Sequence, residues 1–326
     1  MTATSGAASS GGASHIPVLL DRVLDLLAPT VALTSSRPVI VDATLGLGGH
    51  TEAMLERFPD LVVVGIDRDP EAIARSGQRL ARFGDRVVLV NAVYDEIGEA
   101  IRGAGFTAVS GVLFDLGVSS LQLDVKERGF AYAQDAPLDM RMNPSSGLSA
   151  ADVLNTYDER DLARVLWEYG EERFARKIAH AVVEQRSSDP FDTSAPFVEL
   201  IRRSIPAAAR RTGGNPAKRT FQALRIEVND ELGSWRRALP AALDAITVGG
   251  RVVVLAYHSL EDRFAKRTFV AAASSSAPRD LPVVPAEMAP KFTLVTRGAE
   301  QATPAEVAEN PRAKSVRMRA IERIAA

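Results

Sequence analysis

The sequence predicts an α/β protein: a doubly wound, mostly parallel sheet with an inserted helical subdomain. Three observations predict this fold class. Apolar, β-branched runs alternate with helix-like stretches in the first half of the chain, a glycine-rich turn follows the first run, and a long helical stretch interrupts the alternation before it resumes. Strands that are apolar along their whole length are typical of parallel sheets covered by helices on both faces.

The strands follow in chain order. Apolar runs at residues 39–41, 61–66, 86–90, 111–114 and 251–256 are assigned to the parallel part of the sheet. Gly249 and Gly250 indicate a turn before the last of these runs. Residues 292–296 and 316–321 suit a closing antiparallel hairpin.

Helical periodicity dominates between about residues 130 and 216. One stripe has the i, i+3, i+4, i+7 spacing of a helix face: Leu162, Val165, Leu166 and Tyr169. A later stripe predicts one long helix: Phe221, Leu224, Val228, Leu232 and Trp235. We therefore predict a disordered tail at residues 1–14, one domain made of residues 15–130 and 217–326, and an inserted helical subdomain at residues 131–216.

Composition narrows the function. The 326 residues include no cysteine, which excludes disulfides, zinc–thiolate sites, iron–sulfur clusters and a cysteine nucleophile. No metal site is assigned. No apolar run approaches the roughly 18–20 residues that span a bilayer, and the first residues do not resemble a signal peptide, so we expect a cytoplasmic protein without a membrane contact.

A glycine-rich turn carries the strongest local chemistry. Residues 41–50 read VDATLGLGGH, so a strand ends near Asp42 and a helix begins near His50. Glycines let a backbone approach a ligand closely, and a helix N-terminus offers N–H groups to an anion. A simpler interpretation, glycines that serve only a tight turn, stays open.

A second acid, Asp67, ends the second predicted strand, where a carboxylate can accept hydrogen bonds from both ribose hydroxyls of a nucleotide. The turn and this acid together fit either a dinucleotide or S-adenosylmethionine. The third glycine of the dinucleotide fingerprint is replaced by Thr51, and Asp42 would repel a pyrophosphate but suit the amino group of a methionine moiety. The sequence therefore favours S-adenosylmethionine.

The fourth predicted strand ends at Asp115. Ligands of doubly wound folds bind beyond the carboxyl ends of the strands, so Asp115 is expected to meet the cofactor or the substrate, although a helix cap is an alternative.

At this strand the resemblance to a known family becomes specific: the chain resembles the bacterial 16S ribosomal RNA cytosine-N4 methyltransferase family. The matching segments are HIPVLL at 15–20, the glycine turn, GIDRDP at 65–70, residues 114–124, RGF at 128–130, PLDMRM at 137–142, GEERF at 170–174, RTFQALRI at 219–226, HSLEDR at 258–263 and NPR at 310–312. They cover nearly the whole chain in order.

The resemblance implies a Rossmann-like methyltransferase that transfers a methyl group from S-adenosyl-L-methionine to the N4 amine of a cytidine in 16S ribosomal RNA, in the decoding region of the small subunit. It implies cofactor contacts at Gly48, Gly49, His50, Asp67, Tyr94, Asp115 and Gln122. An aromatic side chain such as Tyr94 could stack on the adenine ring. A homodimer is compatible with the sequence.

Some positions depart from the family pattern. Leu47 stands where the family favours glycine, Leu121 replaces a usual proline, and Tyr257 replaces a usual phenylalanine. Asn215 replaces a typical histidine, which puts any substrate role of position 215 in doubt.

The catalytic hypothesis follows from the chemistry of the target amine. Methylation at N4 needs no covalent enzyme intermediate, in contrast with attack at C5, so the absence of cysteine fits N4. The enzyme must align the amine with the methyl group and accept its proton. We expect Asp115 near the reacting centre and His258 or Asp139 orienting the base; a purely structural histidine is an equal alternative for His258.

Basic residues gather in one stretch. Residues 195–220 contain Arg202, Arg203, Arg210, Arg211, Lys218 and Arg219 against the single acid Glu199, although the net charge of the chain is only −2. We predict that these residues bind RNA phosphates and that the inserted subdomain recognises RNA; the alternative is a solvated helix face.

Two other function classes compete with this prediction. The glycine turn also fits a nicotinamide-dependent oxidoreductase, and the basic stretch also fits an RNA-binding assembly factor without catalytic activity. Asp67 and Asp115, placed together with the glycine turn, argue for the methyltransferase.

Overall fold

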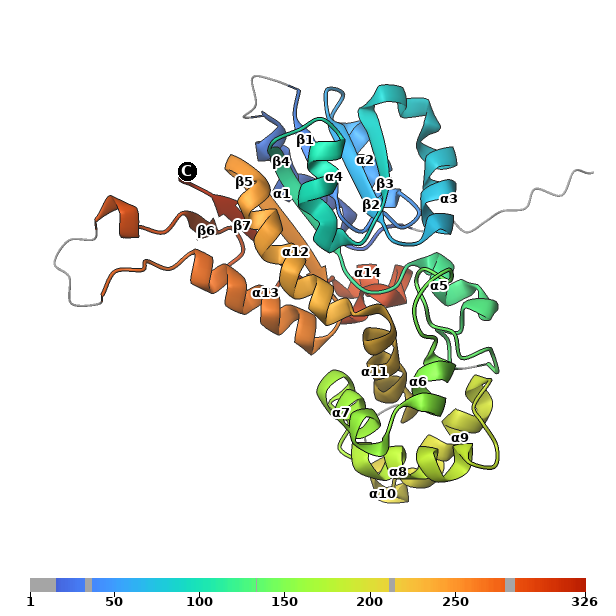
Figure 1. The fold of residues 1–326 in the computed structure, drawn as a ribbon. Helices are drawn as coiled ribbons and strands as arrows, with labels where there is room; N and C mark the ends of the chain where they lie inside the picture. Colours follow the sequence, from blue (N-terminus) through green and yellow to red (C-terminus); the bar gives the residue numbers. More distant parts are fainter. Residues whose placement is uncertain (1–15, 33–36, 133, 211–214, 279–284) are drawn as a thin grey trace, which may run out of the picture.

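The computed structural model describes residues 16–32, 37–132, 134–210, 215–278 and 285–326 (Figure 1). The tail predicted at residues 1–14 lies outside these ranges. The described strands form a sheet in the order β3-β2-β1-β4-β5-β7-β6. They are β1 (Val39–Asp42), β2 (Val62–Asp67), β3 (Val87–Asn91), β4 (Val109–Asp115), β5 (Ile246–Ala256), β6 (Phe292–Leu294) and β7 (Arg317–Arg323). The first five pair in parallel, and β7 is antiparallel to both β5 and β6. The predicted fold class and the closing hairpin are confirmed.

Helices cover both faces of this sheet (Figure 1). One face carries α1 (Leu20–Ala32), α2 (Gly49–Arg57) and α3 (Pro70–Leu80); the other carries α4 (Ile97–Gly103), α12 (Glu231–Ala245) and α13 (Ser259–Ala272). Successive strand residues point to opposite faces: Val39 and Val41 join the core under α12, whereas Ile40 joins the core under α1. Because both faces are buried, these strands are apolar throughout.

The expected turn at Gly249 and Gly250 lies inside β5, which was predicted to begin later. The β4–β5 register runs from Val109 opposite Ile246 directly to Gly111 opposite Arg251, so the intervening residues of β5 form a bulge. Gly249 has φ 82°, and a Cβ at Gly250 would lie 2.8 Å from the carbonyl oxygen of Thr247. Glycine is needed here for a bulge within the strand.

Short helical segments connect β4 to a second lobe, which lies below the sheet in Figure 1. This lobe contains α6 (Ala150–Thr156), α7 (Glu159–Gly170), α8 (Ala175–Arg186), α9 (Ser194–Ser204), α10 (Ala207–Arg210) and α11 (Ala217–Asn229). The connecting and remaining short segments are α5 (Ser120–Asp124), η1 (Ala81–Arg86), η2 (Tyr94–Glu96), η3 (Lys126–Arg128), η4 (Ala286–Met288) and η5 (Pro311–Ser315).

The helical lobe has its own core. Phe197 packs edge-on against Phe191 and tilted against Phe221, with ring centroids 5.8 Å and 5.7 Å apart. Phe221 and Leu224 of α11 belong to this core. By packing, α11 therefore groups with the helical lobe, although the sequence division at 216/217 assigned it to the other domain.

The single long helix predicted from Phe221 to Trp235 is wrong, because the chain breaks at Asp230. Asp230 has φ 45° and separates α11 from α12. The preceding Asn229 donates its amide to the carbonyl oxygen of Met140 and accepts from the Met142 N–H, both at 2.8 Å. These bonds tie the helix end to a distant loop, which turns the chain.

The N-terminal end of the described chain packs beside α14 (Pro304–Glu309). The Leu19 N–H donates to Glu306 at 2.6 Å, the Asn310 amide donates to the Ile16 carbonyl at 3.2 Å, and Arg22 pairs with Glu300 at 2.7 Å. Among the described residues, none of the helices has both the length and the apolar composition that crossing a lipid bilayer requires.

Candidate functional site

A pocket of about 440 Å³ opens at the carboxyl ends of β1, β2, β4 and β5. Thr44, Asp67, Asp115 and Tyr257 line it, each at or just after the end of one of these strands. The strand order reverses between β1 and β4, which is where ligands of doubly wound folds bind.

The glycine turn and Asp67 are joined directly. Gly46 has φ 53°, and its N–H donates to Asp67 Oδ2 at 2.8 Å, while the Asp69 N–H donates to Oδ1 at 2.9 Å. Burial raises the pKa of Asp67 to about 6, although these two N–H groups oppose the shift. The carboxylate is thus held in one orientation with lone pairs left to accept hydroxyl protons.

Gly49 and His50 line the pocket, whereas Gly48 does not. Gly48 has φ 77° and caps the N-terminus of α2, and a Cβ there would lie 3.1 Å from Cδ1 of Leu80. A Cβ at Gly49 would lie 2.7 Å from Cγ of Pro17. Gly48 therefore shapes the turn, and Gly49 lets the segment that contains Pro17 close over it.

Asp42 lies outside the pocket, contrary to the role expected from the sequence. Its side chain accepts from the Thr51 hydroxyl at 2.7 Å and from the Thr44 N–H at 3.3 Å, and the residue is 1% exposed. Asp42 therefore hydrogen-bonds the glycine turn to α2 beneath the pocket wall. It does not line the pocket, so it does not contact a methionine amino group there.

Asp115 lies in the pocket wall between two polar partners. The Tyr257 hydroxyl donates to Asp115 Oδ1 at 2.6 Å, and His50 Nδ1 lies 3.6 Å from Oδ2. The Thr44 hydroxyl accepts from the Asp115 N–H at 2.6 Å. Burial raises the pKa of Asp115, while His50 and the Tyr257 hydroxyl act in the opposite direction.

Tyr94 and Gln122 also line the pocket. The Tyr94 hydroxyl donates to the Glu231 carbonyl at 2.9 Å, and its ring packs edge-on against Phe114. Gln122 accepts from the Ser119 N–H at 3.0 Å and donates to Asp69 at 3.3 Å. All the predicted cofactor contacts except Gly48 are therefore brought to one pocket.

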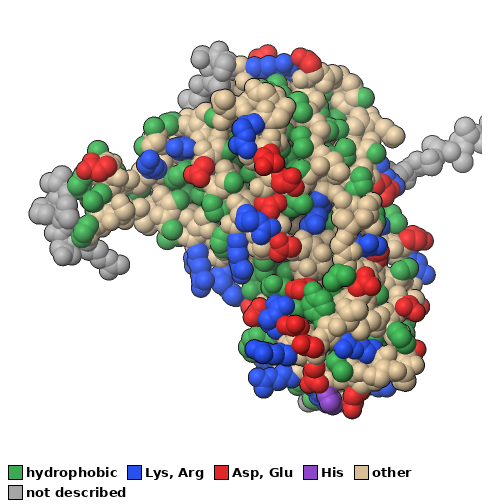
Figure 2. All heavy atoms as spheres, in the orientation of Figure 1, with side chains coloured by type: hydrophobic (Ala, Val, Ile, Leu, Met, Phe, Trp, Pro, Cys, Tyr) green, Lys and Arg blue, Asp and Glu red, His purple; other side chains and the backbone are tan. Residues whose placement is uncertain are grey.

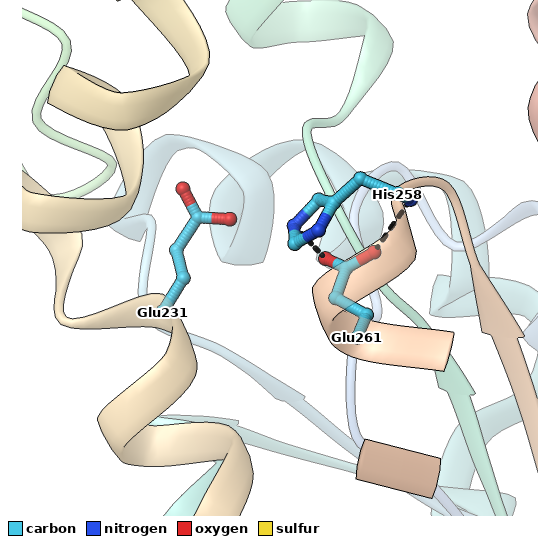
Figure 3. Close-up of side chains that lie close together, drawn as sticks. All are labelled: Glu231, His258 and Glu261. Atoms are coloured by element: carbon cyan, nitrogen blue, oxygen red, sulfur yellow. Dashed lines mark hydrogen bonds and ion pairs between the residues drawn. The ribbon is translucent and has the colours of Figure 1, made fainter. Parts of the chain in front are cut away.

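His258 lies in a charged cluster at the start of α13 (Figure 3). His258 Nε2 is 3.1 Å from Oε1 of Glu261, yet neither ring nitrogen makes a well-aligned hydrogen bond within the described residues. Burial disfavours the charge of Glu261, but His258 and Arg225 hold the pKa of Glu261 below its usual value.

Glu231 completes this cluster from α12 (Figure 3). Arg225 binds both of its oxygens, Nε to Oε1 at 2.7 Å and Nη2 to Oε2 at 2.9 Å. The guanidinium already neutralises Glu231, so we interpret the cluster as an ion network that borders the pocket.

Asp139 does not line the pocket. Its carboxylate binds the side chain of Arg141 through two oxygens, at 3.0 and 2.7 Å, and also accepts from the Arg141 N–H. The structure thus places His258, but not Asp139, in the pocket that Asp115 also lines.

The predicted RNA contacts are spread over three helices. Arg202 and Arg203 are exposed at the end of α9, and Lys218 and Arg219 are exposed at the start of α11. Lys218 lines the pocket. The side chain of Arg210 and the whole of Arg211 lie outside the described residues.

Sequence reasoning missed two groups of residues. Gln222 and Arg225 line the pocket from α11, and their spacing from Lys218 could have identified one polar helix face. Arg263, Lys266 and Arg267 are exposed on α13 at i, i+3 and i+4. Figure 2 shows Lys and Arg side chains gathered along α13 and on the facing side of the lobe around α7 and α8.

Comparisons with known proteins match nearly the whole length of the chain. A model of the MraW methylase family matches residues 12–324. A ribosomal RNA small subunit methyltransferase H of Nocardioides sp. strain JS614 is 67% identical over 312 residues, covering 96% of this chain and 97% of that protein. The proteins of the same name from Frankia alni and Nocardia farcinica are 62% and 61% identical; the matches cover 95% of both chains for the first, and 97% of this chain and 98% of that protein for the second.

These matches confirm the resemblance inferred from the sequence, and with it the prediction of an S-adenosylmethionine-dependent methyltransferase of small-subunit ribosomal RNA. They argue against the nicotinamide-dependent oxidoreductase. A family model that spans residues 12–324 leaves little of the chain unmatched. The chain belongs to the MraW methylase family.

Proposed function

We propose that this pocket holds S-adenosylmethionine beside a cytidine of 16S ribosomal RNA, and that the methyl group passes to the exocyclic N4 amine. The observation that carries the proposal is the position of Asp115, in the wall of one pocket shared by the glycine turn, Asp67 and His258. The Asp115 carboxylate is half-buried, and Lys218, Gln222 and Arg225 of the helical lobe line the same pocket.

The donor half is built by the glycine turn, Asp67, Tyr94 and Gln122. Asp67 accepts hydrogen bonds from the ribose hydroxyls, because two N–H groups fix its carboxylate in place. Tyr94 offers an aromatic ring to the adenine. When bound, S-adenosylmethionine supplies the activated methyl group.

Residues of the pocket accept the proton that the target amine loses. The amine nitrogen forms a bond to the methyl carbon while the carbon–sulfur bond breaks, its electron pair goes to sulfur, and one N4 proton must leave. Asp115 accepts that proton, since its raised pKa makes it a better base than an exposed aspartate. Tyr257 and His50 fix the orientation of the carboxylate.

The helical lobe and the basic residues hold the RNA. Arg202, Arg203, Lys218 and Arg219 supply positive charge on the lobe that borders the pocket, and the cytidine leaves its stack to enter. The full substrate in this proposal is the small ribosomal subunit, which places the enzyme in the cytoplasm.

Replacing Asp115 tests the proposal. Asp115→Ala should lower methyl transfer to small subunits that lack the mark by about 100-fold or more, because the proton acceptor is lost. The assay counts radioactive methyl groups and identifies the nucleoside. Asp85→Ala is the control, since Asp85 is an exposed aspartate outside the pocket. Near-normal turnover by folded Asp115→Ala protein would refute the assignment.

A further inference from the structure

One face of α11 borders the pocket and is polar. Lys218, Gln222 and Arg225 lie at i, i+4 and i+7, and all three line the pocket. The other face of α11, which includes Phe221 and Leu224, packs into the core of the helical lobe. The apolar side of α11 therefore holds the helix in place, and its polar side is available to contact a ligand in the pocket.

Two atoms on this face are left for a ligand. Gln222 donates its amide to the Tyr169 carbonyl at 3.0 Å, but its Oε1 accepts no hydrogen bond from the described residues. Arg225 uses Nε and Nη2 on Glu231, and its Nη1 makes no hydrogen bond to the described residues. Neither atom is a buried atom without a partner, so both are accessible to solvent, and both residues line the pocket.

An independent observation indicates a ligand at the same end of the pocket. The side chain of His258 is only 8% exposed; its Nε2 lies 3.1 Å from Glu261 Oε1, whereas its Nδ1 has no partner within the described residues. A buried polar atom without a partner is costly, so Nδ1 in the wall of a pocket suits a ligand that supplies one. His258 lines the pocket together with Gln222 and Arg225.

We infer that Gln222 and Arg225, with His258, form the subsite that reads the Watson–Crick edge of the target cytosine. Cytosine presents an N4–H donor beside acceptors at N3 and O2, whereas uracil presents an acceptor at position 4 and a donor at N3. Oε1 of Gln222 accepts one N4 proton, and Nη1 of Arg225 donates to the O2 side. The second N4 proton stays free to leave toward Asp115.

This subsite deepens the proposed function and rests on it. Holding one amine proton on Gln222 also sets the direction of the nitrogen lone pair, which has to align with the donor methyl group. Glu231 contributes by clamping the other two nitrogens of Arg225. Uracil would place its O4 against Oε1 of Gln222, an acceptor against an acceptor, and would be rejected.

A matched pair of substitutions separates this role from packing. Gln222→Met and Gln222→Glu both lose the hydrogen bond to Tyr169, but only Glu keeps an acceptor oxygen. If Gln222 reads the base, Gln222→Met should lose about tenfold or more in kcat/KM on small subunits lacking the mark, and Gln222→Glu should lose clearly less. Gln78→Met is the control, because Gln78 is an exposed glutamine of α3 outside the pocket.

Three further measurements decide the outcome. Calorimetric affinity for S-adenosylhomocysteine and the melting temperature should match the wild type in both variants. Inhibition by cytidine monophosphate should exceed that by uridine monophosphate for the wild type, and this ratio should shrink in Gln222→Met. Equal activity of the Met and Glu variants, an unchanged nucleotide ratio, or a loss that parallels a lower melting temperature overturns the inference. A wild-type protein that methylates no cytidine refutes the proposed function itself, and the inference falls with it.

Discussion

The Asp115 carboxylate is balanced between burial, which favours its protonated form, and two partners that favour the ionised form. The Tyr257 hydroxyl is the closer of these two partners of the Asp115 carboxylate. Tyr257 occupies a position at which the methyltransferase family described above usually has phenylalanine. The extra hydroxyl of this chain therefore acts on the proposed proton acceptor.

Tyr257→Phe should move the acidic limb of the pH–rate profile toward higher pH. Loss of the hydroxyl removes a hydrogen bond to the ionised carboxylate, so the pKa of Asp115 rises further and more of it is protonated at a given pH. Below the inflection, turnover should fall by roughly tenfold or less, while the rate at high pH changes little. An unshifted limb, measured with saturating donor, would contradict the role of Tyr257.

Affinity for S-adenosylmethionine should depend on Asp67. The pKa of Asp67 is raised to about 6 by burial, and binding needs the ionised form to accept ribose hydroxyls. Affinity should therefore be constant above about pH 7 and fall as pH drops through 6, approaching about tenfold per pH unit. Calorimetry from pH 5 to pH 8 measures this, with Asp67→Asn as the variant that should show a weak, nearly pH-independent affinity.

At this scale, the sequence predicted the acids that end strands but not the direction of each side chain. Asp67 and Asp115 were placed correctly in the pocket because both follow strands of one parallel sheet. Asp42 ends a strand too, yet its carboxylate accepts a hydrogen bond from Thr51 outside the pocket. The carboxylate of Asp139 binds the guanidinium of Arg141, two residues away. Such contacts depend on tertiary packing, which residue spacing does not reveal.

At the scale of the elements, two backbone segments pass very close to each other in the connection between β4 and the helical lobe. Gly129 has φ 74°, and a Cβ there would lie 2.1 Å from the carbonyl oxygen of Pro137 and 2.9 Å from the Asp139 nitrogen. The adjacent Arg128 binds Asp69 at 2.7 Å and the Met142 carbonyl at 2.7 Å. This turn therefore links the parallel sheet to the loop that supports α11.

Gly129→Ala should destabilise the protein by about 2–4 kcal/mol, since a positive φ and a backbone clash act together. Gly147→Ala is a matched control: Gly147 has φ 83°, but a Cβ there would meet no other atom within 4 Å. It should cost only about 1 kcal/mol. Urea unfolding of both variants measures the difference, and equal losses would mean that the clash at Gly129 is relieved by small shifts.

Element types could be predicted from local sequence patterns, whereas interruptions could not. The parallel strands were predicted from continuous apolar runs, and the helix stripe from Leu162 to Tyr169 was predicted from its 3.6-residue period. The break at Asp230 is imposed by Asn229, which pairs with Met140 and Met142 far away in the chain. The stripe from Phe221 to Trp235 continues across that break, so periodicity alone predicted one helix.

In the whole molecule, two lobes face each other across the pocket, and positive charge lies on both. Glu171 of the helical lobe accepts from Ser259 at 2.9 Å and from Arg263 at 3.1 Å, which joins the lobes beside α13. Lys266 and Arg267 are exposed on α13, one helical turn after Arg263. If the proposed function holds, RNA that reaches the pocket passes exposed Lys and Arg side chains on both lobes, which are interspersed with acidic side chains (Figure 2).

Replacing Arg202, Lys218 and Arg219 together with glutamine should weaken RNA binding and flatten its salt dependence. Each lost phosphate contact lowers the slope of log affinity against log salt concentration by about 0.7 for single-stranded RNA. Filter binding at several salt concentrations measures this slope. Arg57→Gln with Arg75→Gln serves as control, because these arginines pair with acids on α1 and α3 away from the pocket. An unchanged slope in the triple variant would count against the assigned surface.

The position of β7 has a consequence for biosynthesis. β7 lies between β5 and β6, and residues of the nearby segment 304–315 bind Ile16 and Leu19 at the pocket edge. A ribosome that has released only the first 300 residues has therefore delivered neither this interior strand nor the latch on the opposite end of the chain. We expect a nascent chain with only its first 300 residues released to have no competent methyl-donor site, so that catalysis begins only after Arg323 has left the ribosome.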